Sequence, residues 1–97
     1  MTNTIHAIIT SYCLCVKCCG PHATGLNAAG HKPIEGVSIA GPRAYKLGTR
    51  VVIDGHTYVI DDRTARRFDG RWDIYKESHK SALKWGKQEL TVTICTP

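Results

Sequence analysis

The sequence predicts a small, mostly β protein in which six short strands close into a barrel beside one brief helix. Three observations support this fold class: short runs of apolar and β-branched residues, a single segment with helix start and stop signals, and glycine-rich connections. A closed sheet has no exposed edges, which suits a chain of 97 residues that can bury only a small core. We therefore expect a single domain over residues 1–97, with the cysteine-rich loop 12–36 included.

The first predicted strand is Thr4–Thr10, which is rich in isoleucine and alternates loosely. A long loop is expected from residue 12 to residue 36, because four glycines and two prolines interrupt regular structure there. The apolar segment Val37–Ala40 predicts a second, short strand, which Gly41-Pro42 ends.

A β-hairpin is predicted around Asp54-Gly55, which separates the β-branched runs Arg50–Ile53 and His56–Ile60. An Asp-Gly pair between such runs is the strongest short-range hairpin signal. Further strands are expected at Trp72–Tyr75 and Leu90–Cys95.

The helix is predicted at about 78–86, with Ser78 as its N-cap, His79–Trp85 as its body and Gly86 as its stop. We expect His79 to be structural and Trp85 to pack against the sheet. Trp72 alternates with Asp73 and should therefore face the core.

Composition excludes several classes of protein. A hydrophobic fraction of 42% with 22% charged residues is typical of a folded globule and argues against intrinsic disorder. No apolar run approaches the roughly 18–20 residues that a membrane span needs. The net charge of +5 favours polyanionic partners such as nucleic acid, anionic lipid or the acidic cell wall, without choosing among them.

The first ten residues lack the positive region and the apolar stretch of a secretory signal. We therefore expect either that the protein is made in a cytoplasm or that a signal has already been removed.

Four of the five cysteines lie within seven residues, in the pattern C-x-C-x-x-C-C formed by Cys13, Cys15, Cys18 and Cys19. Crowded thiolates could bind a structural zinc ion, although a second C-x-x-C pair at finger-like spacing is absent. One or two disulfides, or buried reduced thiols, would explain the same pattern. These three alternatives remain open at this stage.

The segment 61–75 is the most informative for chemistry, because it combines carboxylates with arginines. Asp62 lies at the end of one predicted strand and Asp73 lies on the next, so the two carboxylates can meet at one rim of a barrel. Cationic neighbours would lower a carboxylate pKa, whereas a like charge or burial would raise it, as an acid catalyst requires. The alternative interpretation is a solvated loop with ordinary ion pairs.

Five blocks, in order, resemble the three-aspartate (3D) domain family, whose fold is a double-psi β-barrel. They are T-x-Y-C-x-C-x-x-C-C-G (10–20), A-T-G-x-x-A-x-G (23–30), G-V-S-I-A-G-P-R-x-x-x-L-G-T-R-V (36–51), D-R-T-A-R-R-F-D-G-R-W-D-I-Y (62–75) and S-H-K-S-A-L-K-W-G (78–86). This domain is the catalytic barrel of membrane-bound lytic transglycosylase A and of many bacterial and phage wall-acting proteins.

The resemblance implies a peptidoglycan lytic transglycosylase that forms 1,6-anhydro sugars. It implies that Asp73, eleven residues after Asp62, is the acid/base, and that Asp62 supports it. An internal nucleophile makes a second catalytic carboxylate unnecessary. Substrate contacts are expected from Tyr12, Thr24, Asp69 and Arg71.

No cofactor is required for this reaction, and a structural zinc at the cysteines is one of the three alternatives left open above. The expected partners are peptidoglycan glycan strands and a delivery protein such as a holin, with neither nucleic acid nor membrane insertion. We expect a monomer that acts in the bacterial wall or periplasm and that could be phage-encoded.

Two departures from the family pattern stand out. Gly41 occupies the position of the family's first aspartate, and Pro42 stands roughly where related barrels carry a histidine. The first departure keeps an alternative open, namely a non-catalytic, expansin-like glycan-binding barrel. A small zinc-stabilised nucleic-acid-binding module is a remote alternative, because the single predicted helix carries only Lys80 and Lys84 on a mixed face.

Overall fold

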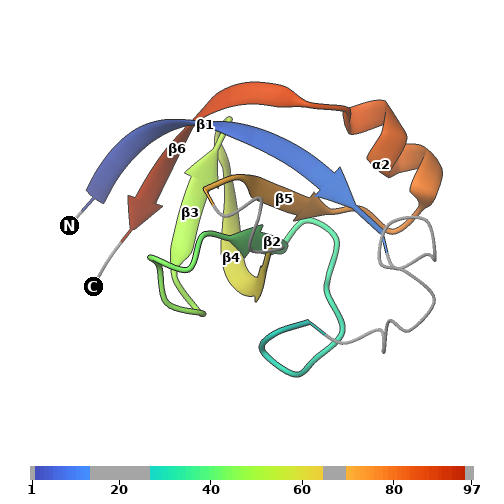
Figure 1. The fold of residues 1–97 in the computed structure, drawn as a ribbon, viewed down its shortest axis with the longest axis horizontal. Helices are drawn as coiled ribbons and strands as arrows, with labels where there is room; N and C mark the ends of the chain where they lie inside the picture. The colour runs from blue at the N-terminus through green and yellow to red at the C-terminus, as the bar shows by residue number, and fades with distance from the viewer. Residues whose placement is uncertain (1, 14–26, 65–69, 96–97) are drawn as a thin grey trace.

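The computed structural model describes residues 2–13, 27–64 and 70–95 (Figure 1). The chain forms six strands and one short helix: β1 (Thr2–Tyr12), β2 (Ser38–Gly41), β3 (Arg50–Ile53), β4 (His56–Arg63), β5 (Trp72–Tyr75), α2 (His79–Trp85) and β6 (Gln88–Cys95). No helix within the described ranges has the length and hydropathy needed to cross a membrane.

The strands close into a barrel in the order β1-β5-β2-β4-β3-β6. The β1–β5 and β2–β4 pairs are parallel and the other pairs are antiparallel. Parallel neighbours need crossover connections, so strands far apart in the sequence lie side by side. The predicted mostly β, closed six-stranded barrel with one short helix is confirmed.

Three strands extend beyond their predicted ends because their partners provide further pairing. β1 pairs with β6 from Thr2 to Ile9 and with β5 from Ile9 to Tyr12, which makes it eleven residues long. β4 likewise continues past Ile60 to Arg63, where it pairs with β2. β6 begins at Gln88, two residues before the predicted start, because Gln88 pairs with Ile9.

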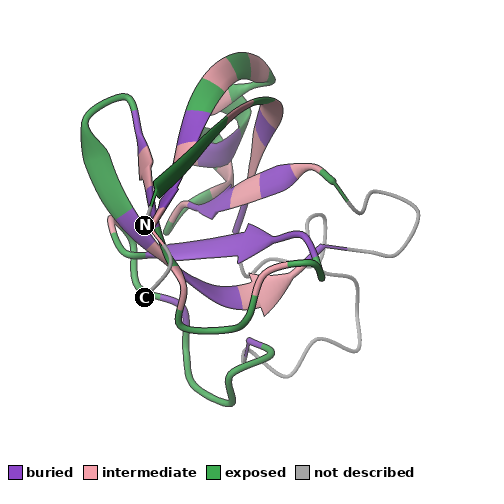
Figure 2. Ribbon diagram, turned by 90° about the vertical axis from the view of Figure 1, so that its left-hand side faces the viewer, coloured by how far each residue is buried: buried purple, intermediate pink, exposed green. Residues whose placement is uncertain are grey.

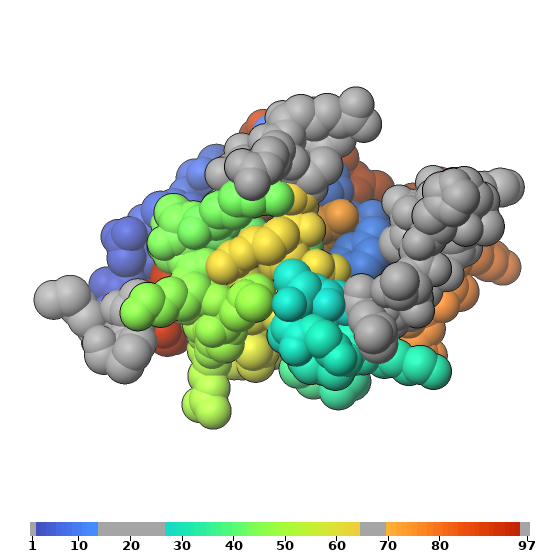
Figure 3. Space-filling view, turned by 60° about the horizontal axis from the view of Figure 1, so that its bottom comes forward, coloured from blue at the N-terminus to red at the C-terminus, as the bar shows by residue number. Residues whose placement is uncertain are grey.

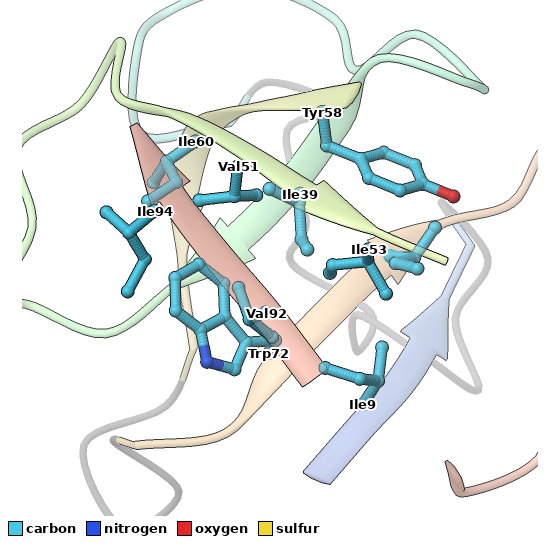
Figure 4. Close-up of a cluster of buried hydrophobic side chains, with 10 residues drawn as sticks. Ile9, Ile39, Val51, Ile53, Tyr58, Ile60, Trp72, Val92 and Ile94 are labelled. Atoms are coloured by element: carbon cyan, nitrogen blue, oxygen red, sulfur yellow. The ribbon is translucent and has the colours of Figure 1, made fainter. Parts of the chain in front are cut away.

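The barrel interior is filled by apolar side chains that alternate along each strand (Figure 4). Trp72 is completely buried at its centre, as predicted, and Tyr45 stacks on it with ring centroids 5.6 Å apart. In Figure 2 the buried segments gather in the barrel wall, whereas the connecting loops and the hairpin are mostly exposed. The ten buried members of this core are Ile9, Ile39, Val51, Ile53, Tyr58, Ile60, Trp72, Ile74, Val92 and Ile94.

The local signals in the sequence appear in the structure as predicted. Asp54 and Gly55 both have positive φ angles, 52° and 75°, and they join β3 to the antiparallel β4. Ser78 caps α2 by accepting a hydrogen bond from the Ser81 backbone N–H, and Gly86 ends the helix at φ 69°. Trp85 packs against the barrel, and its indole N–H donates to the Ile9 carbonyl oxygen at 3.2 Å.

Candidate active site

Two of the predicted site residues lie in one row across four strands. Thr10 of β1 pairs with Asp73 of β5, Asp73 pairs with Ala40 of β2, and Ala40 pairs with Asp62 of β4. Paired residues in a sheet project to the same face, and Trp72 and Ile74 on either side of Asp73 project into the core. The structure therefore brings both carboxylates to the outer face of the barrel.

A β-bulge directs Asp62 onto this row. Ile39 pairs with Ile60, but the next pair is Ala40 with Asp62, so Asp61 has no partner in the register. Without the extra residue, strict alternation after the inward Ile60 would turn Asp62 inward. The bulge exchanges the two directions, so Asp62 reaches the row and Asp61 is buried.

Asp73 is half-buried and has an acidity suited to proton transfer. The Thr10 hydroxyl Oγ1 lies 3.2 Å from the Asp73 Oδ1 and 3.3 Å from the Trp72 carbonyl oxygen, so it can donate to either. Burial raises the pKa of Asp73 to about 6, the hydrogen bond from Thr10 opposes this shift, and the charge of Asp62 adds to it. The like-charge effect expected of Asp62 is therefore present but secondary to burial.

Asp62 is held by three hydrogen-bond donors. Its Oδ1 accepts from the backbone N–H of Ala28 at 3.0 Å and from that of Arg63 at 2.8 Å. Its Oδ2 accepts from the Tyr12 hydroxyl at 3.4 Å. Both oxygens of this carboxylate are thus engaged by the protein, which fixes its position on the row.

Tyr12 reaches Asp62 by lying across the row. Its ring packs with Ala40 and Tyr75, and the two tyrosine ring centroids are 5.5 Å apart. Burial first, and then the nearby carboxylates, raise the pKa of Tyr12 far above its ordinary value, so its hydroxyl remains a hydrogen-bond donor. Figure 3 shows the end of β4 (yellow) against the segment 27–37 (cyan), with part of β1 (blue) next to them.

Sequence reasoning missed a second buried carboxylate beside this row. Asp61 is only 4% exposed and accepts a hydrogen bond from the Ser38 hydroxyl. The His31 Nε2 lies 3.8 Å from its Oδ2. Burial raises the pKa of Asp61, although Ser38 and His31 counteract the shift. The signal in the sequence was the Asp61-Asp62 doublet, because two adjacent acids after an alternating strand indicate that the alternation is broken.

Gly41, where the three-aspartate resemblance expects that family's first aspartate, faces the core in this protein. A Cβ atom on Gly41 would lie 3.0 Å from Ile60 Cδ1 and 3.1 Å from Trp72 Cζ3. These contacts are tighter than ordinary packing, so a larger side chain would force Ile60 or Trp72 to move. A carboxylate at this position would not join the outer row without a change in the backbone.

Among the remaining predicted substrate contacts, Arg71 is the described one, and it does not lie on the row. Arg71 precedes β5 and lines a separate groove of about 370 Å³ beside β1. Thr24 and Asp69 lie outside the described residues, as do Cys15, Cys18 and Cys19. Cys13 is buried, with its Sγ 3.7 Å from the His79 Nδ1. Within the described ranges no group of three or more His, Cys, Asp or Glu side chains is arranged to hold a metal ion.

Comparison with known proteins gives one informative relative. No protein-family model matches the chain. The chain is 30% identical over 81 residues to the Bacillus subtilis (strain 168) protein named "Putative cell wall shaping protein YabE". The match covers 82% of this chain but 20% of that relative, so the chain spans about a fifth of the relative's length. The chain is thus a remote homologue of a protein with a wall-related name, and its closed barrel agrees with the fold that the three-aspartate resemblance implies.

Proposed function

We propose that this protein is a peptidoglycan lytic transglycosylase in which Asp73 is the acid/base. The observation that carries the proposal is the half-buried Asp73 carboxyl, whose pKa is raised to about 6 and which lies on an outer row beside Asp62. A carboxyl group with this pKa exchanges its proton close to neutral pH, which is what an acid and then a base in one reaction needs. The wall-related name of the homologous protein supports this choice of substrate.

In the proposed reaction, the Asp73 carboxyl group donates its proton to the glycosidic oxygen between N-acetylmuramic acid and N-acetylglucosamine. The bond from C1 of the muramic residue to that oxygen breaks. The Asp73 carboxylate then accepts the proton of the muramic C6 hydroxyl as O6 bonds to C1. The product is a 1,6-anhydro sugar, no water is consumed, and Asp73 ends the cycle protonated as it began.

The environment of Asp62 favours this reaction over hydrolysis. A glycoside hydrolase needs a second carboxylate that attacks the sugar or activates water. Both oxygens of Asp62 already accept hydrogen bonds from Ala28, Arg63 and Tyr12. We therefore assign Asp62 the supporting role of keeping the pKa of Asp73 high.

Tyr12 is assigned chiefly to holding Asp62, because its hydroxyl is engaged there and its side chain is only 9% exposed. We therefore expect residues around the row, and not the Tyr12 hydroxyl, to contact the sugar. Thr24, Asp69 and Arg71 remain predicted substrate contacts.

The test is digestion of purified sacculi, followed by mass analysis of the released muropeptides. Wild-type protein should release 1,6-anhydro products, and Asp73→Asn should slow their release by roughly 10²–10⁴-fold, because the general acid is lost. Asp54→Asn, a change at an exposed turn that tolerates asparagine, is the matched control and should keep full activity. Products with only reducing ends, or equal activity in Asp73→Asn, would overturn the proposal.

A second candidate function, a non-catalytic glycan-binding barrel, is favoured by one observation. Position 41 lacks the family's first carboxylate, and the surrounding core leaves little room for one. This alternative predicts that wild-type protein and Asp73→Asn sediment equally with insoluble sacculi and that neither releases soluble product.

A further inference from the structure

A second groove, of about 600 Å³, lies at the mouth of the barrel beneath α2. Two inward-facing core side chains, Tyr58 and Ile74, form part of its lining, and Trp85 of α2 faces it from the helix. In Figure 1 the helix lies near the arrowhead ends of β1 and β5. Barrel mouths are common positions for ligand sites, and this volume lies in the range that such sites have.

Two lysines line the groove without a carboxylate partner among the described residues. Lys76 Nζ lies 5.2 Å from the centroid of the Trp85 ring, and Lys84 lies one residue before that tryptophan. The ion pair between His31 and Asp61 lies outside this groove. Two ammonium groups next to an aromatic surface form a favourable place for an anionic oxygen group.

The other polar groups around the groove show what else a ligand would meet. Glu35 is exposed at its rim, where Oε1 accepts the Glu77 backbone N–H at 3.0 Å. His56 contacts the Gly36 carbonyl oxygen through Nε2 at 2.6 Å, and its ring lies tilted against that of Tyr58, with the centroids 4.5 Å apart. A groove with two cations, one carboxylate and aromatic walls fits a ligand of mixed charge and partly apolar surface.

We infer that this groove binds a short carboxylate-bearing peptide of the kind that wall glycans carry as stems. Lys76 and Lys84 would receive the carboxylate, Trp85 and Tyr58 would contact the apolar side chains, and Glu35 would accept an amine or amide N–H. Glu35 at the rim disfavours a dense polyphosphate chain, because like charges repel. The choice of a wall peptide rests on the proposed function.

The groove and the candidate active site occupy opposite faces of the same strand. Ile74 projects into the groove, whereas Asp73, its neighbour along β5, projects to the outer row. A peptide held in the groove therefore leaves Asp73 accessible, and peptide binding is separable from cleavage.

The experiment titrates a synthetic stem tetrapeptide, free of glycan, into the full chain and follows tryptophan fluorescence. Trp72 is fully buried, so we expect the signal to come from Trp85. The double variant Lys76→Gln/Lys84→Gln should bind at least about tenfold more weakly, because two charge-assisted contacts are removed. The control Lys32→Gln/Lys46→Gln changes the net charge equally at exposed positions away from the groove and should bind like wild type.

Equal affinities of the two double variants, or no saturable binding by wild type, would overturn the inference. Stronger binding of a glycerol-phosphate polymer, in competition with the peptide, would overturn the choice of ligand. Because the titration involves no bond cleavage, it succeeds or fails independently of the transglycosylase proposal. Peptide-free glycan strands supply the complementary arm, since Lys76→Gln/Lys84→Gln should cleave them at the wild-type rate if that proposal holds.

Discussion

At the scale of single residues, burial separates the behaviour of two carboxylates on the same row. Asp73 is half-buried and accepts a hydrogen bond from Thr10, whereas Asp62 accepts from three protein donors. Desolvation disfavours the charged form of Asp73, and no cation among the described residues forms an ion pair with it to reverse the effect. The half-buried position of Asp73 in the sheet is therefore what keeps its carboxyl group protonated to a higher pH than an exposed aspartate.

The raised pKa of Asp73 also predicts a stability change with pH. Its pKa rises from 3.8 to about 6 on folding, so the native state binds more protons between these values and loses stability as the pH rises through them. Asp73→Asn cannot ionise and still offers an oxygen to Thr10. The variant should therefore be more stable than wild type by about 1–3 kcal/mol above pH 6.

Urea unfolding at pH 4 and pH 8 measures this difference. The advantage of Asp73→Asn should become small at the lower pH, where the native Asp73 carboxyl is protonated and the unfolded one is only partly ionised. An advantage that stays constant between the two pH values would contradict the raised pKa.

At the scale of elements, the bulge between β2 and β4 and the hairpin between β3 and β4 shape the molecule. The bulge turns Asp62 outward and buries Asp61 against Ser38. The hairpin sets the antiparallel register that places Tyr58 opposite Val51 in the core. The bulge depends on the unpaired Asp61, and the hairpin depends on the positive φ angles of Asp54 and Gly55.

The hairpin yields a direct prediction. Gly55 has φ 75°, a conformation that alanine adopts only at a cost, so Gly55→Ala should lower the free energy of unfolding by about 1 kcal/mol. For a domain of this size, a loss of that order lowers the melting temperature by about 4–8 °C. Asp54→Asn is the control and should melt like wild type, because asparagine tolerates positive φ. An unchanged melting temperature in Gly55→Ala would show that the turn is not under this constraint.

At the scale of the whole molecule, closure and charge are the dominant features. The barrel leaves no free sheet edge among its six strands, and the long β1 joins β5 on one side to β6 on the other. The net charge of +5 is carried by a chain that we propose to act on an acidic wall polymer. A net positive charge strengthens the encounter with such a polymer over distances that salt can screen.

Attachment to the wall should therefore weaken with salt. The fraction of the inactive Asp73→Asn protein that sediments with sacculi should fall as NaCl rises from about 0.05 to about 0.5 M, because the screening length shortens. The matched measurement uses sacculi stripped of anionic polymer, for which the dependence on salt should be smaller. Sedimentation that does not change with salt would show that attachment does not depend on charge.

Much of the secondary structure could be predicted from local signals. Asp54-Gly55 predicted the hairpin, Ser78 and Gly86 predicted the helix ends, and the alternation at Trp72 predicted a core residue. Each of these depends on backbone angles or hydrogen bonds within a few residues. Strand ends were less predictable, since β1 and β4 lengthen through pairing with distant strands.

For the candidate active site, too, some features could be predicted from the sequence and others depended on the tertiary structure. The sequence by itself indicated that the Asp62 and Asp73 carboxylates can meet on one side of a barrel, because Asp62 follows one predicted strand and Asp73 lies on the next. The tertiary structure decided that Asp62 faces outward, through the bulge between β2 and β4. Only the tertiary structure decided that Asp61 is buried, that Gly41 faces Ile60 and Trp72, and that the pKa of Asp73 rises. The physical reason is that a bulge, a core contact and desolvation arise when segments far apart in the chain meet, and no local pattern records where they meet.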